Sequence, residues 1–180
     1  MEPRTRDPSP ADYERWLAPV EGSLIRVISR LLRDENDADD ALQDALERIW
    51  RQKDRLRNHP NPAALVLRIG LNAAYDILRR RVRSRRHETD GVSIESRTDP
   101  SLGAAERLEV QETCSEVLRA IARLPRNQAL AIAMRFADGE SYCEIAQVLG
   151  CSESTARTHV ERGRARLARV LMIRIEGGTR

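Results

Sequence analysis

Residues 141–167 read SYCEIAQVLGCSESTARTHVERGRARL, and this stretch decides the fold of the second half of the chain. Ser141 and Glu144 have the spacing of a capping box, which begins a helix. Gly150 lies where a tight turn needs a residue in the left-handed region, and Ser152 can cap the helix that follows. Two short helices joined by a turn that contains glycine are typical of a helix-turn-helix motif.

The second helix of this motif would carry the residues that contact DNA, because such a helix lies in the major groove. Ala146, Ala156 and Val160 would pack the two helices together and leave the opposite face free. The residues predicted to face base edges or phosphates are Ser154, Thr155, Arg157, Thr158, Glu161, Arg162, Arg164 and Arg166. The alternative is a generic pair of amphipathic helices with a solvated basic face. The joint spacing of small residues and caps favours DNA binding.

Apolar residues also recur at helical spacing in the first half of the chain, in residues 24–32, in residues 38–50 and in a segment that starts at Pro62. In residues 38–50 the apolar side is predicted to include Leu46 and Trp50. The segment from Pro62 continues into a run of arginines. Three long helices with short connections predict a compact helical bundle.

The whole chain is therefore expected to be all-α, with two small helical domains joined by a flexible acidic linker. The first domain is predicted to span residues 1–86 and the second residues 109–180. The linker, residues 87–108, contains glycine, proline and several acidic residues with little apolar periodicity.

The composition excludes several classes of protein. The 180 residues are 33% charged and only 3% aromatic, and the mean hydropathy is −0.55. No apolar run approaches the roughly 20 residues that a membrane-spanning helix needs, and no apolar signal segment follows Met1. The three cysteines form no CxxC pair, which is typical of reduced thiols. We therefore expect a cytoplasmic protein with no direct insertion into a membrane.

The net charge of +3 conceals an alternation along the chain. Residues 61–86 carry a net charge of +6, residues 87–118 a net charge of −6 and residues 119–180 a net charge of +5. Two positive segments separated by an acidic one suggest two places that could meet a polyanion. The arginines of the first positive segment that are predicted to contact phosphates are Arg79, Arg80, Arg81 and Arg83. A solvated tail is the alternative for this run.

Neither a metal site nor a catalytic site is expected. The acidic residues 37–44, DADDALQD, have no histidine or cysteine nearby, and their charge suits a helix N-terminus. They favour either a surface for a protein partner or a solvated face. Cys143, Cys151 and His159 lack a fourth zinc ligand, and the two cysteines are predicted to be packing residues.

Enzymatic activity on nucleic acid would need a nucleophile beside a base or a carboxylate–metal cluster, and the three histidines are scattered. The chain is therefore predicted to be no enzyme and to need no cofactor. A self-sufficient helix-turn-helix regulator, binding an operator as a dimer, is the remaining alternative. The absence of a heptad stripe for dimerisation counts against it.

The order of these parts resembles bacterial RNA polymerase sigma factors of the extracytoplasmic-function (ECF) subfamily. Residues 37–50, DADDALQDALERIW, look like the family's stretch of the form AEDLVQETFLRAW. Residues 65–81, LVLRIGLNAAYDILRRR, are similar to WLLRIARNLALDWLRRR. Residues 124–167 follow the family's fourth region nearly from end to end.

The resemblance implies that the chain binds core RNA polymerase and directs it to promoter DNA. The positions that would dock on the clamp helices of the largest polymerase subunit are Asp40, Gln43, Asp44 and Arg48. The positions that would contact the minus-ten element are Asn58, His59, Asn61, Arg68 and Asn72, with the arginine run on its phosphates. The helix-turn-helix would read the minus-thirty-five element as duplex DNA.

The chain departs from the family pattern in two places. Leu65 stands where the family has tryptophan, and residues 51–74 contain no aromatic side chain, so polar residues would have to do more of the strand opening. Ala156 replaces a usual valine in the recognition helix. Many relatives are held inactive by an anti-sigma protein. The sequence is equally compatible with that partner and with autoinhibition by packing of one domain on the other.

Overall fold

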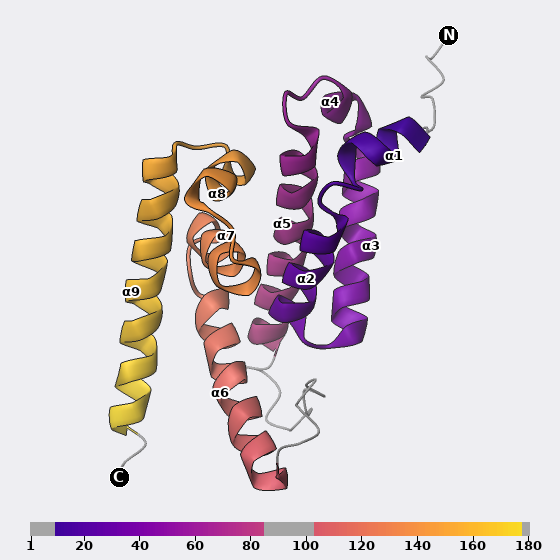
Figure 1. Cartoon of the computed structure of the whole chain (residues 1–180). Helices are drawn as coiled ribbons and strands as arrows, with labels where there is room; N and C mark the ends of the chain where they lie inside the picture. The colour runs from indigo at the N-terminus through magenta and orange to yellow at the C-terminus, as the bar shows by residue number, and fades with distance from the viewer. Residues whose placement is uncertain (1–9, 85–102, 178–180) are drawn as a thin grey trace.

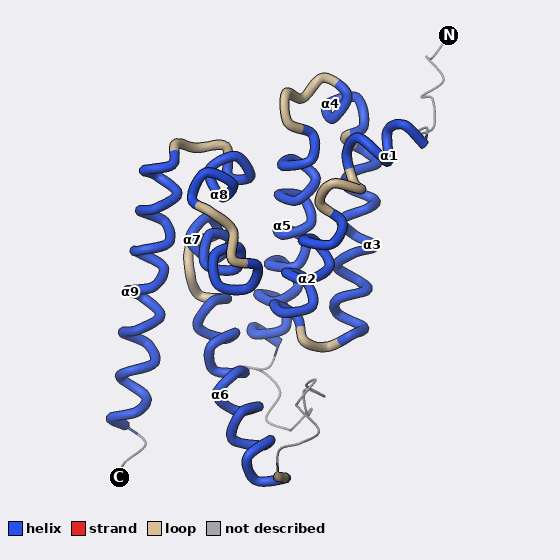
Figure 2. The backbone as a smooth tube through the Cα atoms, viewed as in Figure 1, coloured by secondary structure: helices blue, strands red, loops and turns tan. Residues whose placement is uncertain are grey.

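The computed structural model describes residues 10–84 and 103–177, and every element in these two ranges is helical (Figure 1, Figure 2). In chain order the elements are α1 (Pro10–Trp16), α2 (Glu21–Leu32), α3 (Glu35–Arg51), α4 (Lys53–Arg57), α5 (Pro62–Ser84), α6 (Ala104–Ala122), α7 (Arg126–Ala133), the π-helical turn η1 (Met134–Asp138), α8 (Tyr142–Leu149) and α9 (Glu153–Gly177). We call α1–α5 the first domain and α6–α9 the second domain. The prediction of an all-α protein is confirmed. Within the described residues, no helix is both long enough and apolar enough to cross a membrane.

The central helix α5 begins where its sequence predicts. The side chain of Asn61 accepts a hydrogen bond from the backbone N–H of Ala64 at 3.0 Å, which is the geometry of an N-cap. Pro62 follows at the first helical position, where its missing N–H costs nothing. From there α5 is apolar on most of its circumference, and helices of this kind are buried from more than one side.

Helix α3 packs beside α5 and has a side-chain cap at its first turn. The side chain of Asp34 accepts a hydrogen bond from the N–H of Asp37 at 3.0 Å. The buried residues of α3 are Ala41, Ala45 and Ile49, which lie along one side of the helix.

Only part of the predicted apolar side of this helix is buried, and Leu46 and Trp50 lie outside that part. Leu46 is 43% exposed and Trp50 is 45% exposed. Each residue follows a buried one, Ala45 or Ile49, and one residue further along a helix turns the side chain by about 100°. This rotation carries both residues beyond the stripe that α5 covers.

The second domain contains the predicted helix-turn-helix. The capping box of Ser141 and Glu144 is complete, and Gly150 ends α8 in the left-handed region with φ 65°. The side chain of Ser152 accepts a hydrogen bond from the N–H of Thr155 at 3.2 Å and so begins α9, as predicted. Instead of a short helix, α9 continues for 25 residues.

The boundary predicted for the linker needs a correction. The linker is predicted to extend to residue 108, but α6 begins at Ala104, so the last five of these residues are helical. The sequence shows no strong apolar stripe in this first turn and a half of α6, and Leu108 is 57% exposed there. Residues 87–102 of the predicted linker lie outside the described residues.

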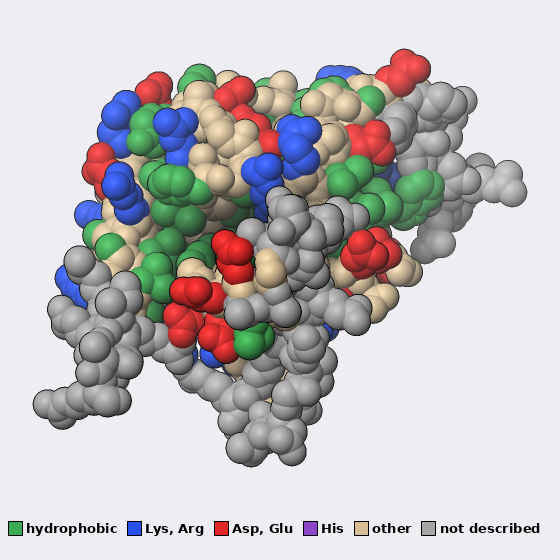
Figure 3. Space-filling view, turned by 60° about the horizontal axis from the view of Figure 1, so that its bottom comes forward, with side chains coloured by type: hydrophobic (Ala, Val, Ile, Leu, Met, Phe, Trp, Pro, Cys, Tyr) green, Lys and Arg blue, Asp and Glu red, His purple; other side chains and the backbone are tan. Residues whose placement is uncertain are grey.

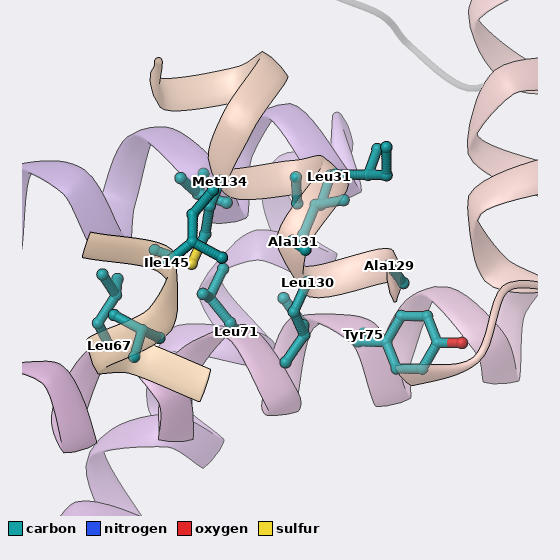
Figure 4. Close-up of a cluster of buried hydrophobic side chains, with 14 of the residues drawn as sticks. Leu31, Leu67, Leu71, Tyr75, Ala129, Leu130, Ala131, Met134 and Ile145 are labelled. Atoms are coloured by element: carbon teal, nitrogen blue, oxygen red, sulfur yellow. The ribbon is translucent and has the colours of Figure 1, made fainter. Parts of the chain in front are cut away.

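The two domains share one hydrophobic core (Figure 4). Leu67, Leu71 and Tyr75 of α5 meet Leu130 of α7, and α2 reaches the same core through Leu31. Met134 of η1 and Ile145 of α8 complete the contact and are both nearly inaccessible to solvent. Helix α5 is therefore covered by α2 and α3 from the first domain and by α7 and α8 from the second.

The junction of the domains leaves an apolar groove between α2, α6 and η1, with a volume of about 430 Å³. Val117 and Leu118 lie along one wall, Phe136 stands 62% exposed on the other, and Arg30 and Arg33 stand at the border. Figure 3, which brings the lower end of the molecule forward, shows hydrophobic side chains gathered between arginine and acidic side chains.

We predict that Gly163→Ala destabilises the chain. A β-carbon at this position of α9 would lie 2.7 Å from Cγ1 of the buried Ile132 in α7, so the two helices would have to separate. Overpacking of this kind costs about 1–3 kcal/mol, and the better helix propensity of alanine offsets up to about 1 kcal/mol. Urea unfolding followed by circular dichroism measures the difference.

The matched control for this substitution is Gly22→Ala. Gly22 is exposed in α2, and its nearest neighbour would be the flexible end of Arg26. The control should be neutral or slightly stabilising. Equal unfolding midpoints for both variants would contradict the close packing of α7 on α9.

Candidate nucleic-acid and polymerase interfaces

The predicted recognition face of α9 is accessible. Ser154, Thr155, Glu161 and Arg162 are exposed. Thr158 is half-buried, and its hydroxyl donates to the carbonyl of Ser154 at 2.9 Å. Helix α9 lies on the outer side of the second domain, away from α5 (Figure 1). The face predicted to read duplex DNA is therefore free of protein contacts from the first domain.

Arg157 is the most constrained of the predicted base-reading residues. Its guanidinium stands 4.4 Å from the ring centre of Tyr142 in α8 and 3.7 Å from the carboxylate of Glu153. Arg135 stands 5.1 Å from the centre of the same ring. Cation–π contact with Tyr142 orients Arg157 before any DNA is bound.

The arginines further along α9 divide into two groups. Arg162 and Arg164 are exposed and extend into solvent. Arg166 instead donates a hydrogen bond to the side-chain oxygen of Gln128 in α7 at 2.9 Å. Gln128 is nearly buried, so Arg166 helps to hold α9 against α7. Arg166 was predicted to contact DNA together with its neighbours, because a spacing pattern alone does not show which arginine bonds to another helix.

The loop before α5 is ordered by its own predicted site residues. Asn58 donates to the carbonyl of Asp54 at 3.0 Å, which closes the end of α4. Nδ1 of His59 lies 3.1 Å from the N–H of Asn61, which donates to it. Asn61 caps α5 with its side-chain oxygen and donates through its side-chain nitrogen to Gln147 of α8 at 2.9 Å.

Arg68, Asn72 and Asp76 form a polar stripe along α5, because residues four apart lie on one face of a helix. Asn72 donates to the carbonyl of Arg68 at 2.7 Å, and its side-chain oxygen accepts from Arg126 of α7 at 2.8 Å. An asparagine inside a helix commonly has a structural role, in which its side chain bonds to the backbone of its own helix. Asn72 has that role and also contacts the second domain.

The other two members of the stripe also meet the second domain. The guanidinium of Arg68 lies against Gly150, at the carboxyl end of α8, where the helix dipole favours a cation. The carboxylate of Asp76 lies 2.5 Å from Arg126 and 3.4 Å from Arg48 of α3. The α5 face predicted for the minus-ten element is therefore in contact with α7 and α8.

The arginine run at the end of α5 is not uniform. Arg80 and Arg83 are exposed, and Arg79 stands 5.7 Å from the ring centre of Tyr75. Arg81 turns inward and pairs with Asp34, at 3.1 Å, and with Asp37. These two carboxylates are at the start of α3, so Arg81 joins α5 to α3 and is less free to contact a phosphate than the others.

The outer face of α3 combines charge with exposed apolar surface. Asp40 and Gln43 are exposed, and Asp44 pairs with Arg48 at 2.6 Å. Trp50 also belongs to this face, and the ammonium group of Lys53 stands 5.1 Å from its ring centre. An exposed tryptophan is typical of the core of a protein–protein interface, and polar and charged residues such as those around it are typical of the rim.

The cysteines give no sign of a metal site. Cys151 is half-buried against the core, which agrees with the packing role predicted for it, but Cys143 is exposed and the prediction that it packs is wrong. Position 143 lies in the first turn of α8, on the opposite side of the helix from the buried Ile145. Across the described residues, no group of three metal-ligating side chains comes together.

Comparison with known proteins identifies the family. Residues 16–84 match the family described as Sigma-70 region 2, and residues 114–167 match Sigma-70, region 4. The chain is 35% identical over 148 residues to the ECF RNA polymerase sigma factor SigM of Mycobacterium tuberculosis, covering 82% of this chain and 71% of the relative. The chain belongs to the ECF family of RNA polymerase sigma factors. The resemblance predicted from the sequence is confirmed.

Other relatives agree with this assignment. The chain is 31% identical over 135 residues to the ECF RNA polymerase sigma-E factor of Escherichia coli, covering 71% of this chain and 70% of that one. The fold is shared with RpoE of Bartonella quintana, which was solved in complex with the anti-sigma factor NepR. The TM-score is 0.53 and the sequence identity is 24%, and the match covers 90% of this chain and 98% of RpoE. The fold is also shared with CnrH, solved with the cytosolic domain of CnrY, at a TM-score of 0.53 and 24% identity over 87% and 85% of the two chains.

Three residues at the junction of the sigma domains were not predicted from the sequence. Arg126 and Gln147 belong to the second domain, and their partners, in α5 or at the residue just before it, are 50 or more residues away in the chain. One feature of the sequence could have indicated Asp76, because it is the single acidic residue among residues 61–86. A lone carboxylate in a strongly basic segment is a candidate for a specific ion pair.

A cluster of carboxylates lies where the junction meets the helix-turn-helix. Asp138 at the end of η1 accepts from Arg26 of α2 at 2.6 Å. Burial, followed by the neighbouring carboxyl groups of Glu144 and Asp138, raises the pKa of Glu140 from its ordinary value near 4.5 to about 7. Arg135 does not neutralise Glu140 directly, because its guanidinium donates to the backbone carbonyl of that residue at 2.8 Å.

We predict that Glu140 makes the free energy of unfolding depend on pH. The unfolded chain releases this proton near pH 4.5 and the folded chain near pH 7, so the folded chain holds more protons in between. The stabilising effect is complete below pH 4.5 and is lost as the pH rises through about 7. Urea unfolding at several pH values from 4.5 to 8 should show this slope reduced in Glu140→Gln.

The control for this series is Glu112→Gln, a substitution on the exposed surface of α6. It should keep the pH dependence of the wild-type chain. If Glu140→Gln and Glu112→Gln gave the same slope, Glu140 would not be the group responsible.

Proposed function

We propose that this ECF sigma factor binds core RNA polymerase and directs promoter-specific initiation of transcription. One observation carries the proposal: a region 2 match and a region 4 match follow one another in a single chain, and each brings an exposed face suited to its partner. The outer face of α3 offers charge and an exposed tryptophan, and α9 offers a polar and basic face.

The polymerase would dock on the outer face of α3. The predicted docking residues Asp40, Gln43, Asp44 and Arg48 share this face with Leu46 and Trp50, which are exposed without any role in the core. A large aromatic side chain at the centre of an interface commonly supplies much of the binding energy. The clamp helices of the largest polymerase subunit are the partner that we propose for this face.

Promoter DNA would be read in two places. The face of α9 suits the major groove of the minus-thirty-five element. The loop at residues 58–61 and the polar stripe of α5 suit the minus-ten element. Because residues 51–74 contain no aromatic side chain, an unpaired base would be held by hydrogen bonds rather than by stacking on an aromatic ring.

The chain would act through binding energy alone, as a factor that is not itself an enzyme and needs no cofactor. Opening the promoter costs a few kcal/mol for each unstacked base. Contacts to polymerase and to phosphates would offset that cost. The side chain of His59, the histidine nearest the predicted minus-ten site, takes part in the hydrogen bonding of its own loop and stands beside no nucleophile that the structure describes.

An anti-sigma protein is the further partner that we propose. Two proteins of the same fold, RpoE of Bartonella quintana and CnrH, were solved in complexes with NepR and CnrY. Those complexes were formed by RpoE and CnrH and not by this chain. They support the proposal because the same fold binds an anti-sigma partner in RpoE.

Run-off transcription tests the proposed function. Purified core polymerase is assayed on a library of promoter fragments with and without the chain. Transcripts that depend on the chain and share two upstream elements would support the proposal. If no transcript depended on the chain although it bound duplex DNA tightly alone, the proposal would give way to a dimeric regulator.

We predict that reversing the charge of Asp40 and Asp44 together weakens binding to core polymerase by at least tenfold, because both carboxylates lie on the proposed docking face. Trp50→Ala should weaken it further in combination. Binding is measured by fluorescence anisotropy of the labelled chain. The matched control reverses the exposed acidic residues Glu109 and Glu112 of α6, and an equal loss in the control would refute the assignment of α3.

We also predict that Arg157→Ala and Arg162→Ala relax the choice of sequence at the minus-thirty-five element. Each substitution should cost about 1–3 kcal/mol on the preferred sequence and much less on others. Arg164→Ala is the comparison, because a phosphate contact weakens binding to all sequences alike and reduces the salt dependence. A uniform loss for Arg157→Ala or Arg162→Ala would reassign that arginine to phosphates.

A further inference from the structure

One arginine of the recognition helix is held in place by two residues that were not predicted to contact DNA. The side chain of Arg157 is 53% exposed, yet its guanidinium stands 4.4 Å from the ring centre of Tyr142 and 3.7 Å from the carboxylate of Glu153. Arg162 and Arg164 of the same helix are also exposed, and they make no ion pair or ring contact among the described residues. The recognition face therefore combines one constrained arginine with free ones.

We propose that Tyr142 and Glu153 form a holder for Arg157 that determines how strictly the minus-thirty-five element is read. The proposal rests on the function proposed above, since it concerns the reading of that element by α9. Tyr142 and Glu153 are positioning residues. They fix the direction of the arginine that contacts a base, and they need no contact with the base themselves.

Both residues of the holder are fixed by the caps of the helix-turn-helix. Tyr142 is the first residue of α8 and directly follows Ser141, whose capping box is complete. Glu153 is the first residue of α9 and directly follows Ser152, whose hydroxyl accepts a backbone N–H from the first turn. The left-handed turn at Gly150 brings the two helices into contact. The ring and the carboxylate thus reach the same guanidinium from two capped helices.

The ring of Tyr142 has a defined position before any DNA is bound. It is half-buried and packs against the hydrophobic core. On the side of η1, the guanidinium of Arg135 stands 5.1 Å from its centre and is anchored by donation to the carbonyl of Glu140 at 2.8 Å. A packed tyrosine has little rotamer freedom left to lose, so it offers a fixed surface to a cation.

The holder leaves donors of Arg157 free for a base. A guanidinium carries several N–H donors in one plane and can stack on an aromatic ring through its flat face. The ion pair with Glu153 involves one terminal nitrogen. The remaining donors suffice for the bidentate pair that arginine makes with O6 and N7 of guanine. Contacts with the ring, the carboxylate and the base can therefore exist together.

Holding Arg157 in this way favours a base edge over a phosphate. A free arginine can reach a phosphate in any sequence, and that contact carries no sequence information. The carboxylate of Glu153 repels phosphates from the first turn of α9, and the ring of Tyr142 restricts the directions open to Arg157. A side chain that is ordered beforehand also loses less entropy on the correct base pair. The preferred sequence gains affinity that other sequences do not.

Each residue of the holder also has an ordinary structural role. Tyr142 adds to the hydrophobic core, and an acidic residue in the first turn of a helix interacts favourably with the helix dipole. Loss of these roles would change the stability of the chain or its affinity for all duplexes alike. Loss of positioning changes the ratio between sequences, so the test measures that ratio.

The first readout needs no DNA. In the isotope-labelled full chain, the Nε–H signal of Arg157 is assigned by its absence from the NMR spectrum of Arg157→Ala. We expect the ring current of Tyr142 to shift this signal upfield from the signals of exposed arginines such as Arg162. Tyr142→Leu should abolish the shift, and Tyr142→Phe should keep it because it keeps the ring. An unshifted signal in the wild-type chain would overturn the holder.

The second readout is discrimination between sequences by the full chain. A pool of randomised duplexes is enriched with the wild-type chain. Fluorescence anisotropy then gives the ratio of dissociation constants between the best duplex and the same duplex with one base pair changed. The base pair is the one at which Arg157→Ala loses most discrimination. Tyr142→Leu should lower this ratio about two- to fivefold, the size expected of a cation–π contact at an exposed site, and Tyr142→Phe should keep it.

Two further variants separate the members of the holder. Glu153→Gln should lower the ratio about twofold, because an exposed ion pair contributes little, and should do so by tightening binding to the changed duplex. Arg135→Ala is the matched control, since Arg135 contacts the same ring but belongs to η1 and not to the recognition helix. It should leave the ratio unchanged.

The double variant decides whether the ring acts through Arg157. In the Arg157→Ala background, Tyr142→Leu should cause no further loss of discrimination, because the holder has nothing to hold. The same loss in both backgrounds, or an equal weakening of all duplexes by Tyr142→Leu, would overturn the positioning role. If the wild-type chain distinguished no sequence, alone or in run-off transcription, the proposed function would fail while the NMR signal still decided whether the ring holds Arg157.

Discussion

The burial of α5 from two sides is the constraint on which the rest of the structure depends. Along its first four turns this helix is apolar in nearly every direction, so no single layer of helices could cover it. Helices α2 and α3 cover one side, and α7 and α8 cover the other. The domains of this sigma factor are therefore joined through a shared core rather than through their covalent connection alone.

The same helix explains why the two predicted DNA faces differ. The polar stripe formed by Arg68, Asn72 and Asp76 interrupts the apolar surface and lies at the edge of the shared core, where it requires polar partners. Arg126 and the end of α8 supply them. Helix α9 contributes little to this core, since it packs on α7 and α8 from outside, and its polar face stays in solvent.

Local features could be predicted from the sequence because they depend on residues a few positions apart. The capping box at Ser141, the cap at Ser152 and the left-handed Gly150 are all confirmed, as is the all-α fold. Each relies on a backbone group that a nearby side chain satisfies, which needs no knowledge of the tertiary structure.

Tertiary features could not be predicted in this way. The spacing of apolar residues placed Leu46 and Trp50 on the apolar side of α3, but how much of that side is buried depends on which helices pack against α3. The inward turn of Arg81 toward Asp34 and Asp37, and the pairing of Arg126 with Asp76, likewise join residues about 45 to 50 positions apart. In the candidate site, the residues could be predicted from the sequence, whereas their contacts with the other domain could be found only from the structure.

Small-angle X-ray scattering of the free, unmodified chain tests most directly whether the second domain covers α5. A compact particle is predicted, with a single maximum in its distance distribution and a radius of gyration close to that of a single compact domain of this length, about 16 Å. A distribution with two maxima, as expected for two separated domains on a tether, would contradict the shared core on which the account rests.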